Sequence, residues 1–134
     1  MDNLWVTQIE ENIATYIDAE LNETADILVT TEDYTGDTAS FPAVYVHELP
    51  QVERGYDIEG TSINGVLSTF QIEVYCNTKP ECRKISNDVL SIMKDLRFEV
   101  TASPLYTGEN GYCFSVSRYR RLVGGEDLDL ITRE

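Results

Sequence analysis

The hydrophobic pattern is clearest between Val66 and Phe98, where its period changes from two residues to between three and four. Apolar and polar residues first alternate, with Phe70, Ile72, Val74 and Cys76 set against Thr69, Gln71, Glu73 and Tyr75. Apolar residues then recur on one side of a helix, at Cys82, Ile85, Val89, Ile92 and Leu96. These periods predict a half-buried strand that leads directly into an amphipathic helix, and such a unit must lie on a sheet.

This helix is predicted to begin at a capping box around Thr78. The Thr78 hydroxyl can accept a hydrogen bond from the backbone N–H of Glu81, and the Glu81 carboxylate can reach back to Thr78. Pro80 falls in the first turn, where its missing N–H costs nothing. The start of the helix is therefore specified by local chemistry as well as by the hydrophobic pattern.

Three elements are predicted in the first half of the chain. Residues 3–22 carry an apolar stripe at helical spacing and predict a helix. Residues 26–31 are rich in β-branched side chains and predict a short strand at or near a sheet edge. After a polar loop over residues 32–41, a second strand is predicted over residues 43–49, opened by Pro42 at a position that needs no donor.

Residues 51–65 show no sustained period and contain three glycines and mixed charges. They predict a long connection between the second and third strands, with an extended hairpin as the alternative. A connection of this length in a small domain suggests either a partner-binding arm or a mobile loop. If it is an arm, Arg54, Tyr56 and Asp57 are its candidate contacts with a neighbouring copy or a partner.

The last third of the chain predicts a hairpin. A strand over residues 98–105 is interrupted by Pro104, and Asn110-Gly111 is a strong turn signal because both residues tolerate positive φ. A final strand over residues 112–123 alternates, with Tyr112, Phe114 and Val116 on one face and Cys113, Ser115 and Ser117 on the other. The acidic end, residues 126–134, is predicted to be a loose tail.

The predicted order is helix, three strands, helix, two strands, which indicates an α+β fold. We expect one domain over residues 1–125, with a mixed, largely antiparallel sheet of about five strands and both helices packed on it. Strands two and three can form one hairpin and strands four and five another. The helix after Thr78 would join the two hairpins, in a right-handed crossover if it links parallel strands.

Charge changes the functional picture. The 134 residues include 24 acidic and 10 basic side chains, a net charge of −14, and the first basic residue is Arg54. Long-range repulsion therefore disfavours binding to a phosphate backbone. The N-terminus does not resemble a signal peptide and no apolar run is long enough to span a membrane, so we expect a soluble protein that is intracellular where it is made and binds no membrane.

Candidate chemistry is sparse. The three cysteines, Cys76, Cys82 and Cys113, form no CxxC pair and are expected to be buried structural thiols. His47, the single histidine, lies in a predicted strand, and no phosphate-binding loop is present. Asp127-Leu128-Asp129 lacks the geometry of a calcium loop. We expect no enzymatic activity, no metal and no cofactor.

Arg118, Arg120 and Arg121 form the one concentrated cationic feature. An arginine fork binds a carboxylate through two parallel hydrogen bonds, so these residues can meet the acidic first half of a neighbouring copy. The alternative is pairing within the chain, with the first helix or the first strand. The sequence alone does not distinguish pairing with a neighbouring copy from pairing within the chain.

The segments 41–46 (FPAVYV), 69–75 (TFQIEVY) and 118–124 (RYRRLVG), with a variable loop and a helix between them, give the chain a familiar arrangement. Over residues 4–125 the chain resembles the tail terminator, or tail completion, proteins of long-tailed bacteriophages. That resemblance implies a small mixed sheet with two helices, in agreement with the prediction from the residues. It also implies a homo-hexameric ring at the head-proximal end of the tail in the virion.

In such a ring the implied partners are the tail tube protein and the head–tail connector protein. The ring would halt tube polymerisation and offer the surface for head joining, while DNA passes through an acidic lumen without specific binding. Two other hypotheses stand beside it. One is another neck component, such as a head-closure or minor capsid protein; the other is a small acidic enzyme or ligand-binding domain that uses carboxylates and tyrosines in a cleft.

Overall fold

The computed structural model describes residues 4–23, 25–32, 41–56, 63–109 and 112–124. Within these ranges the chain forms two helices and six strands, which are α1 (Leu4–Leu21), β1 (Leu28–Thr30), β2 (Ala43–Glu48), β3 (Val52–Tyr56), β4 (Ile63–Cys76), α2 (Lys79–Asp95), β5 (Glu99–Glu109) and β6 (Tyr112–Gly124). Neither helix combines the length and the apolar character that a membrane span needs.

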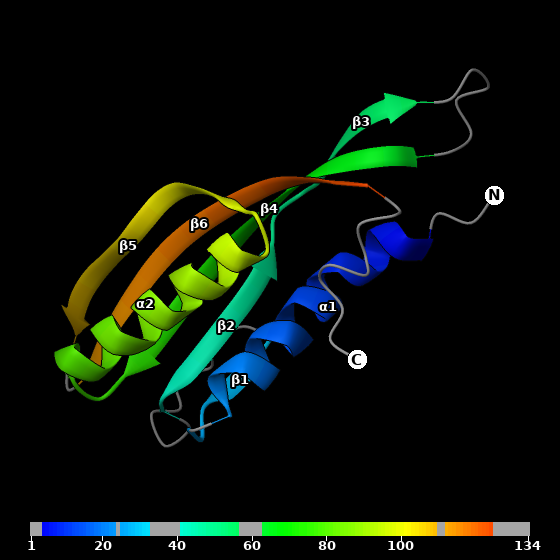
Figure 1. Ribbon diagram of the computed structural model, residues 1–134. Coiled ribbons are helices and arrows are strands. Elements are labelled where there is room, and N and C mark those ends of the chain that lie inside the picture. The colour runs from blue at the N-terminus through cyan, green and yellow to red at the C-terminus, as the bar shows by residue number, and fades with distance from the viewer. Residues whose placement is uncertain (1–3, 24, 33–40, 57–62, 110–111, 125–134) are drawn as a thin grey trace.

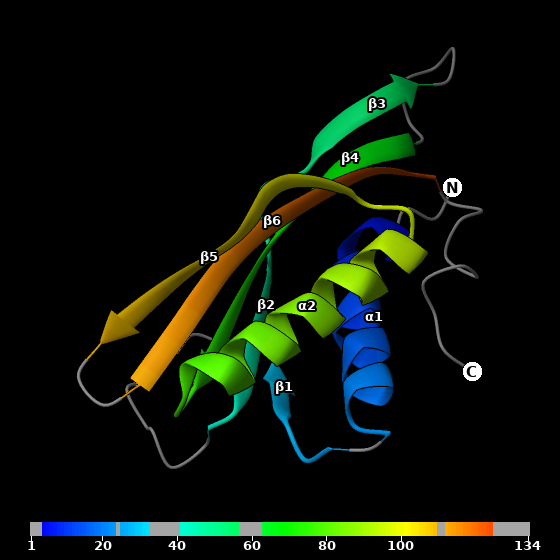
Figure 2. The same ribbon diagram turned by 60° about the vertical axis from the view of Figure 1, so that its left-hand side comes forward.

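The strands form one sheet in the order β1-β2-β4-β6-β5, and β3 pairs with β4. The β1–β2 pair is parallel, whereas all other pairs are antiparallel. Both helices lie on the same face of this sheet, with α1 over β1 and β2, and α2 over the strands beyond them (Figures 1 and 2). The predicted α+β class, with a mixed and largely antiparallel sheet, is confirmed.

The core lies between the sheet and the helices. Phe70 of β4 meets Phe98 edge to face at 5.7 Å between ring centroids, and both rings are buried. The inward residues of α1 are Ile9, Ile13, Ile17 and Leu21, and those of α2 include Cys82, Ile85, Val89, Ile92 and Met93. The apolar stripes predicted for both helices are therefore the faces that pack on the sheet.

Strands β2 and β3 follow one another along the same edge of β4. Val44 of β2 lies opposite Val74, and Val52 of β3 lies opposite Leu67. Between them the Leu49 N–H donates to the Thr69 carbonyl at 2.8 Å, which continues the ladder across the break. Strand β3 and the first residues of β4, Ile63–Leu67, therefore form a hairpin arm, and the extended-hairpin alternative for this region is confirmed.

The prediction of a long connection over residues 51–65 is wrong for residues 52–56 and 63–65, which are strand. An edge strand pairs on one side only and does not need a buried face, so its sequence can lack a sustained apolar period. Asp57 and the rest of the predicted loop lie outside the described residues, as do Asn110-Gly111 and the tail over residues 126–134.

Strand β1 begins later than predicted because the Asn22 side chain forms hydrogen bonds with the backbone of Ile27. The Asn22 side chain accepts from the Ile27 N–H at 2.6 Å and donates to the Ile27 carbonyl at 2.9 Å. Pairing with β2 therefore begins only at Leu28, which lies opposite Ala43. The strand is at the sheet edge, as predicted.

Strand β5 is longer than predicted and continues past Pro104 to Glu109. Its register against β6 shifts between Val100 and Ala102 and again between Ala102 and Leu105. These irregularities accommodate a proline that cannot donate to the ladder, as is common at sheet edges.

Helix α2 links β4 to β5. Both strands run antiparallel to β6, so they are parallel to each other. Thr78 is the N-cap, and its hydroxyl accepts from the Glu81 N–H at 3.4 Å. Pro80 lies in the first turn, as predicted.

The end of α2 is a Schellman motif. The Phe98 N–H donates to the Met93 carbonyl and the Arg97 N–H donates to the Lys94 carbonyl, both at 2.9 Å. Arg97 takes a φ of 68° at the position where glycine is usual. Both ends of the crossover helix are thus closed by local hydrogen bonds.

Candidate interaction surface

Within the residues that the structure describes, one face of the sheet carries no helix (Figures 1 and 2). Alternation along β6 decides which side chains lie on it. Cys113, Ser115, Ser117 and Tyr119 point to the helices and are buried, whereas Tyr112, Phe114, Val116, Arg118, Arg120 and Leu122 point to the helix-free face. The predicted division of Tyr112, Phe114 and Val116 from Cys113, Ser115 and Ser117 is confirmed.

An aromatic patch occupies one end of this face and comprises Phe41, Tyr45, Tyr75, Tyr112 and Phe114. Tyr75 is its centre: the ring stacks on Phe114 at 5.3 Å and meets Tyr45 edge to face at 5.3 Å. Phe41 stacks on the same ring at 5.7 Å. Each such contact contributes about 0.5–1.5 kcal/mol beyond area burial, so the patch is a rigid surface made from three neighbouring strands and Phe41, two residues before β2.

Exposed apolar and fixed polar groups border the patch. Leu105 of β5 is 71% exposed and lies opposite Val116 in the ladder. On the other side, Glu73 accepts hydrogen bonds from the Tyr75 hydroxyl and the Gln71 amide, each at 3.0 Å. The patch therefore has an open apolar side toward β5 and a hydrogen-bonded polar border along β4.

Arg118 and Arg120 form an arginine band across the middle of the face. The Arg118 Nε donates to Gln71 Oε1 at 3.0 Å, and the Arg120 Nε donates to Glu99 Oε2 at 2.9 Å. The Arg120 and Glu99 side chains are 48% and 63% exposed, so solvent screens this ion pair strongly. Neither partner lies in the first helix or the first strand, which were the expected partners within the chain.

Arg121 does not belong to the arginine band. It faces the helix side of the sheet, opposite Ser68 of β4, and is half-buried. Tyr119, which lies between Arg118 and Arg120 in sequence, is fully buried on the same side as Arg121, and its burial raises the pKa of the phenol. The three arginines that are close in sequence are thus divided between the two faces of the sheet.

An aliphatic row lies on the hairpin arm, at the other end of the helix-free face. Leu67 of β4 lies opposite Val52 on one side and Leu122 on the other. Val52 is 45% exposed and Leu122 is 57% exposed. The sequence analysis did not single out this row, although alternation along β4 and β6 places Leu67 and Leu122 on the helix-free face.

The other residues predicted for the arm are only partly placed. The backbones of Arg54 and Tyr56 lie in β3, opposite Gly65 and Ile63. Strand β3 pairs with β4 along one of its edges, and its other edge lies at the border of the sheet (Figure 1).

Acidic side chains gather on α1, which contains Glu10, Glu11, Asp18 and Glu20 and no lysine or arginine. Two of them, Glu11 and Asp18, line an acidic groove of about 250 Å³ between α1 and the edge strand β1. The remaining lining includes the hydroxyl-bearing residues Thr15, Thr30 and Thr31. Carboxylates and hydroxyl oxygens are the acceptors that a guanidinium group binds.

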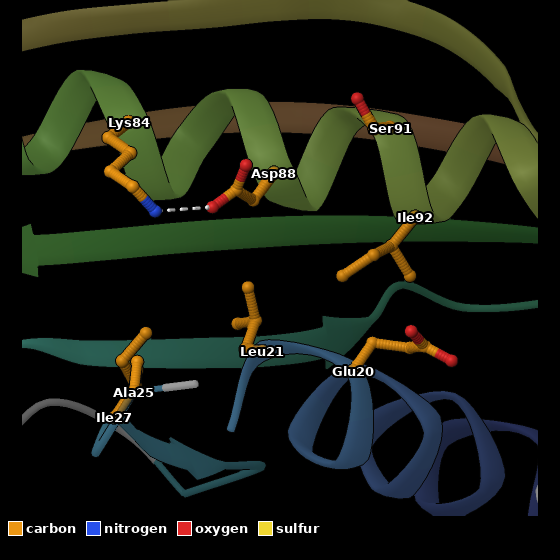
Figure 3. A pocket seen from close by; sticks show the side chains of 8 residues that line it. All are labelled: Glu20, Leu21, Ala25, Ile27, Lys84, Asp88, Ser91 and Ile92. Atoms are coloured by element: carbon orange, nitrogen blue, oxygen red, sulfur yellow. Dashed lines mark hydrogen bonds and ion pairs between the residues drawn. The ribbon is translucent and has the colours of Figure 1, made fainter. Parts of the chain in front are cut away.

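A second groove, of about 240 Å³, lies between the end of α1 and the middle of α2 (Figure 3). Leu21, Ile27 and Ile92 supply its apolar lining. At its rim Lys84 Nζ lies 3.2 Å from Asp88 Oδ2, and both side chains are well exposed. The groove is small, and Lys84 and Asp88 at its rim already pair with each other.

Glu48 is the one described carboxylate whose pKa is clearly shifted, and it lies outside both grooves. Burial raises its pKa above the ordinary value, and hydrogen bonds from Ser68 and Gln51 oppose the shift. The Gln51 amide also donates to the Val6 carbonyl at 2.9 Å, and Glu10 accepts from the Glu48 N–H at 2.8 Å. This network fastens α1 to the junction of β2 and β3.

His47 faces the helix-free side of the sheet, opposite Gln71 of β4. Among the residues that the structure describes, no group of three or more His, Cys, Asp or Glu side chains is placed to hold a metal ion.

The fold and the surface together define an α+β protein with a two-layer structure and one sheet face free of helices. Comparison of the chain with models of known protein families finds no match, and comparison with curated protein sequences finds none either.

Proposed function

We propose that this protein is a structural assembly protein that caps a bacteriophage tail tube as a homo-hexameric ring. In this role it terminates tube polymerisation and offers the surface to which the head is joined, without enzymatic activity. The observation that carries the proposal is the helix-free face of the sheet, where the aromatic patch and the aliphatic row lie on either side of the arginine band.

The composition of this face supports a protein–protein interface. Tyrosine, phenylalanine and arginine are enriched at interfaces, whereas lysine is depleted there. The chain's lysines, Lys79, Lys84 and Lys94, all lie in α2, on the other side of the sheet. Exposed apolar residues at both ends of the face, such as Leu105 and Leu122, are the kind that a partner would cover.

Charge complementarity supports a head-to-tail contact between copies. The arginine band lies on β6, next to the β5 edge, whereas the acidic groove lies beside β1 at the opposite edge of the sheet. A surface on one edge that matches a surface on the other makes a heterologous interface, and such interfaces generate rings when the rotation closes. We therefore infer that Arg118 and Arg120 of one copy meet Glu11 and Asp18 of the next.

Apolar contacts would accompany the charged ones. Leu28 of the β1 edge is 45% exposed and Leu105 of the β5 edge is 71% exposed. Joining the two edges would cover both side chains. Burial of apolar area stabilises the contact, while the charge pairs fix its register.

The net charge supports the passage of DNA through the ring. The excess of carboxylates over residues 1–53 gives the lumen a negative potential, which repels a phosphate backbone and prevents sticking. The tail tube protein and the head–tail connector protein are the other partners in this proposal. A ring whose lumen is lined mainly by lysine and arginine contradicts it.

The test is polymerisation of the cognate tail tube protein with and without this chain, followed by negative-stain imaging. We expect shorter tubes of narrow length distribution, each with a ring of added density at one end. Tubes that reach the same lengths with saturating protein, and whose ends carry no ring, would overturn the proposal. Free monomers in solution do not decide the matter, because a ring can assemble on the tube alone.

Another neck component is the alternative within the same class. Deletion of the gene separates the two: overlong tails identify a terminator, whereas filled heads beside normal, unattached tails identify a head-closure or minor capsid protein. A small acidic enzyme or ligand-binding domain is the alternative from a different class. An enzyme of this kind would hold a carboxylate with a shifted pKa in a cleft. Glu48 is the described carboxylate with a raised pKa, and it lines neither of the two grooves described above.

A further inference from the structure

A series of hydrogen bonds follows β4 along the helix-free face and ends at Arg118. The Tyr75 hydroxyl and the Gln71 Nε2 both donate to the Glu73 carboxylate, each at 3.0 Å. The Arg118 Nε donates to Gln71 Oε1, also at 3.0 Å, and the two residues lie directly opposite each other in the ladder. Gln71, Glu73 and Tyr75, here called the β4 network, thus connect the arginine band to the aromatic patch.

The chemistry of these groups fixes the direction of each hydrogen bond. A guanidinium only donates and a carboxylate only accepts, so the Gln71 amide turns its oxygen to Arg118 and its nitrogen to Glu73. Tyr75 anchors the other end of the β4 network, because its ring is only 8% exposed and stacks on Phe114. The Arg118 guanidinium is exposed to solvent, yet it is held at Nε by groups whose own positions are fixed.

The two residues of the arginine band differ in the charge of their partners. Arg120 donates to Glu99, a carboxylate, so part of its charge is offset within the chain. Arg118 donates to the neutral amide of Gln71, which orients the guanidinium without offsetting its charge. Both bonds use Nε, and the Nη nitrogens carry the remaining donors of each guanidinium. Of the two arginines, Arg118 is therefore the better prepared to bind a carboxylate from outside the chain.

We propose that Arg118 is a preorganised carboxylate-binding site and that Gln71 is the residue that positions it. This use of Arg118 rests on the proposed function: in the head-to-tail contact, its Nη nitrogens bind Glu11 or Asp18 in the acidic groove of the next copy. Ordering a flexible side chain opposes association, and the β4 network orders Arg118 before the two copies meet. Arg118 is thus the principal charged anchor of the contact, and Arg120 is secondary.

The test uses full-length variants and measures the protein concentration that caps half of the tail tube ends. Gln71→Met keeps the length of the side chain and removes both of its hydrogen bonds, so we expect about two- to tenfold more protein to be needed. Glu99→Gln keeps an acceptor for Arg120 and removes the charge that competes with the neighbouring copy, so less protein should be needed.

A double variant separates positioning from a general effect on the fold. Arg118→Lys keeps the charge but loses Nε and the planar guanidinium, so it should lose about as much capping as Gln71→Met. If Gln71 acts through Arg118, the double variant should be no weaker than either single variant. If Gln71 has only a structural role, the two losses should multiply.

NMR of the free protein gives a readout that needs no tube. The Arg118 Nε–H should be protected from exchange with solvent in the parent and should lose this protection in Gln71→Met. Capped tubes that do not respond to Gln71→Met, losses that multiply in the double variant, or an unprotected Arg118 Nε–H in the parent would each overturn the positioning role while the proposed function stands. If the parent itself caps no tubes, the proposed function fails and this use of Arg118 fails with it.

Discussion

Arg97 closes α2 in a left-handed backbone conformation, with a φ of 68°. The side chain of any L-residue crowds the backbone there, whereas glycine has no Cβ to do so. We therefore expect Arg97→Gly to raise the free energy of unfolding by about 0.5–1 kcal/mol, measured by urea denaturation. Arg97→Ala is the matched control: it removes the same charge but keeps the Cβ, so it should bring no gain. Equal stabilisation by both variants would mean that charge, and not backbone strain, is responsible.

Glu48 should give the protein a pH-dependent stability. Its pKa is raised in the folded state, so the folded protein binds this proton more tightly than the unfolded chain. Stability contributed at this residue is therefore full below the ordinary carboxyl pKa and is lost as the pH rises through the raised value. We expect Glu48→Gln to raise the melting temperature at neutral pH and to leave it nearly unchanged in acid.

Ser68→Ala should have the opposite effect on stability to Glu48→Gln, because Ser68 is a hydrogen-bond partner of Glu48. The Ser68 hydroxyl donates to the Glu48 carboxylate and so favours its ionised form. Its removal should raise the Glu48 pKa further and deepen the loss of stability at neutral pH. Parallel melting curves against pH for the parent and both variants would show that Glu48 does not control this dependence.

At the scale of the element, the N-cap of α2 is a local hydrogen bond whose contribution to stability can be tested by itself. Thr78→Ala removes the acceptor for the Glu81 N–H and should lower the free energy of unfolding by about 1 kcal/mol. Thr78→Ser keeps a hydroxyl and should retain most of the stability. The measurement is chemical denaturation with helix content followed by circular dichroism; equal losses in the two variants would argue against a capping role.

The elements that could be predicted from the sequence are those with a buried face. In α2 and β4 the apolar period matches the geometry of burial, so type and position follow from the residues. Strand β3 could be predicted only as part of the extended-hairpin alternative, because it pairs on one edge only and its glycine and charged residues resemble a loop. The late start of β1 depends on a hydrogen bond between the Asn22 side chain and the Ile27 backbone, and the periodicity of apolar residues does not indicate this contact.

The candidate surface was only partly predictable for a similar reason. Adjacent strand residues point to opposite faces, so Arg120 and Arg121 had to separate once β6 was a strand. The acidic groove, by contrast, joins Asp18 of α1 to Thr30 of β1, and only the packing of helix on sheet brings them together. Contacts between elements distant in sequence are the part of the site that required the structure.

At the scale of the whole molecule, the proposed head-to-tail contact predicts a charge swap. Arg120→Glu and Asp18→Arg should each weaken ring formation, because each places like charges across the interface. The double variant restores opposite charges and should recover assembly in part. The readout is the fraction of tube ends that carry a ring in negative-stain images, together with tube length.

Lys94→Glu is the control for this swap, since it makes the same charge change on α2, away from the arginine band. It should leave assembly unchanged. The contact should also weaken as salt concentration rises, because exposed charge pairs are screened. Unchanged rings and tube lengths with Arg120→Glu, or equal loss with Lys94→Glu, would remove the arginine band from the interface.

The long strand β4 has a consequence for how the molecule opens. Its 14 residues extend about 48 Å at roughly 3.4 Å per residue, whereas the 17 residues of α2 extend only about 25 Å at 1.5 Å per residue. Helix α2 alone therefore cannot cover the whole strand, and the hairpin arm projects past it (Figure 1). Amide protons of residues 66–76 should then exchange with solvent only on global unfolding, while those of residues 63–65 exchange through local fraying. A single strand would thus have a slowly exchanging part fixed in the core and a faster end free to adapt to a partner.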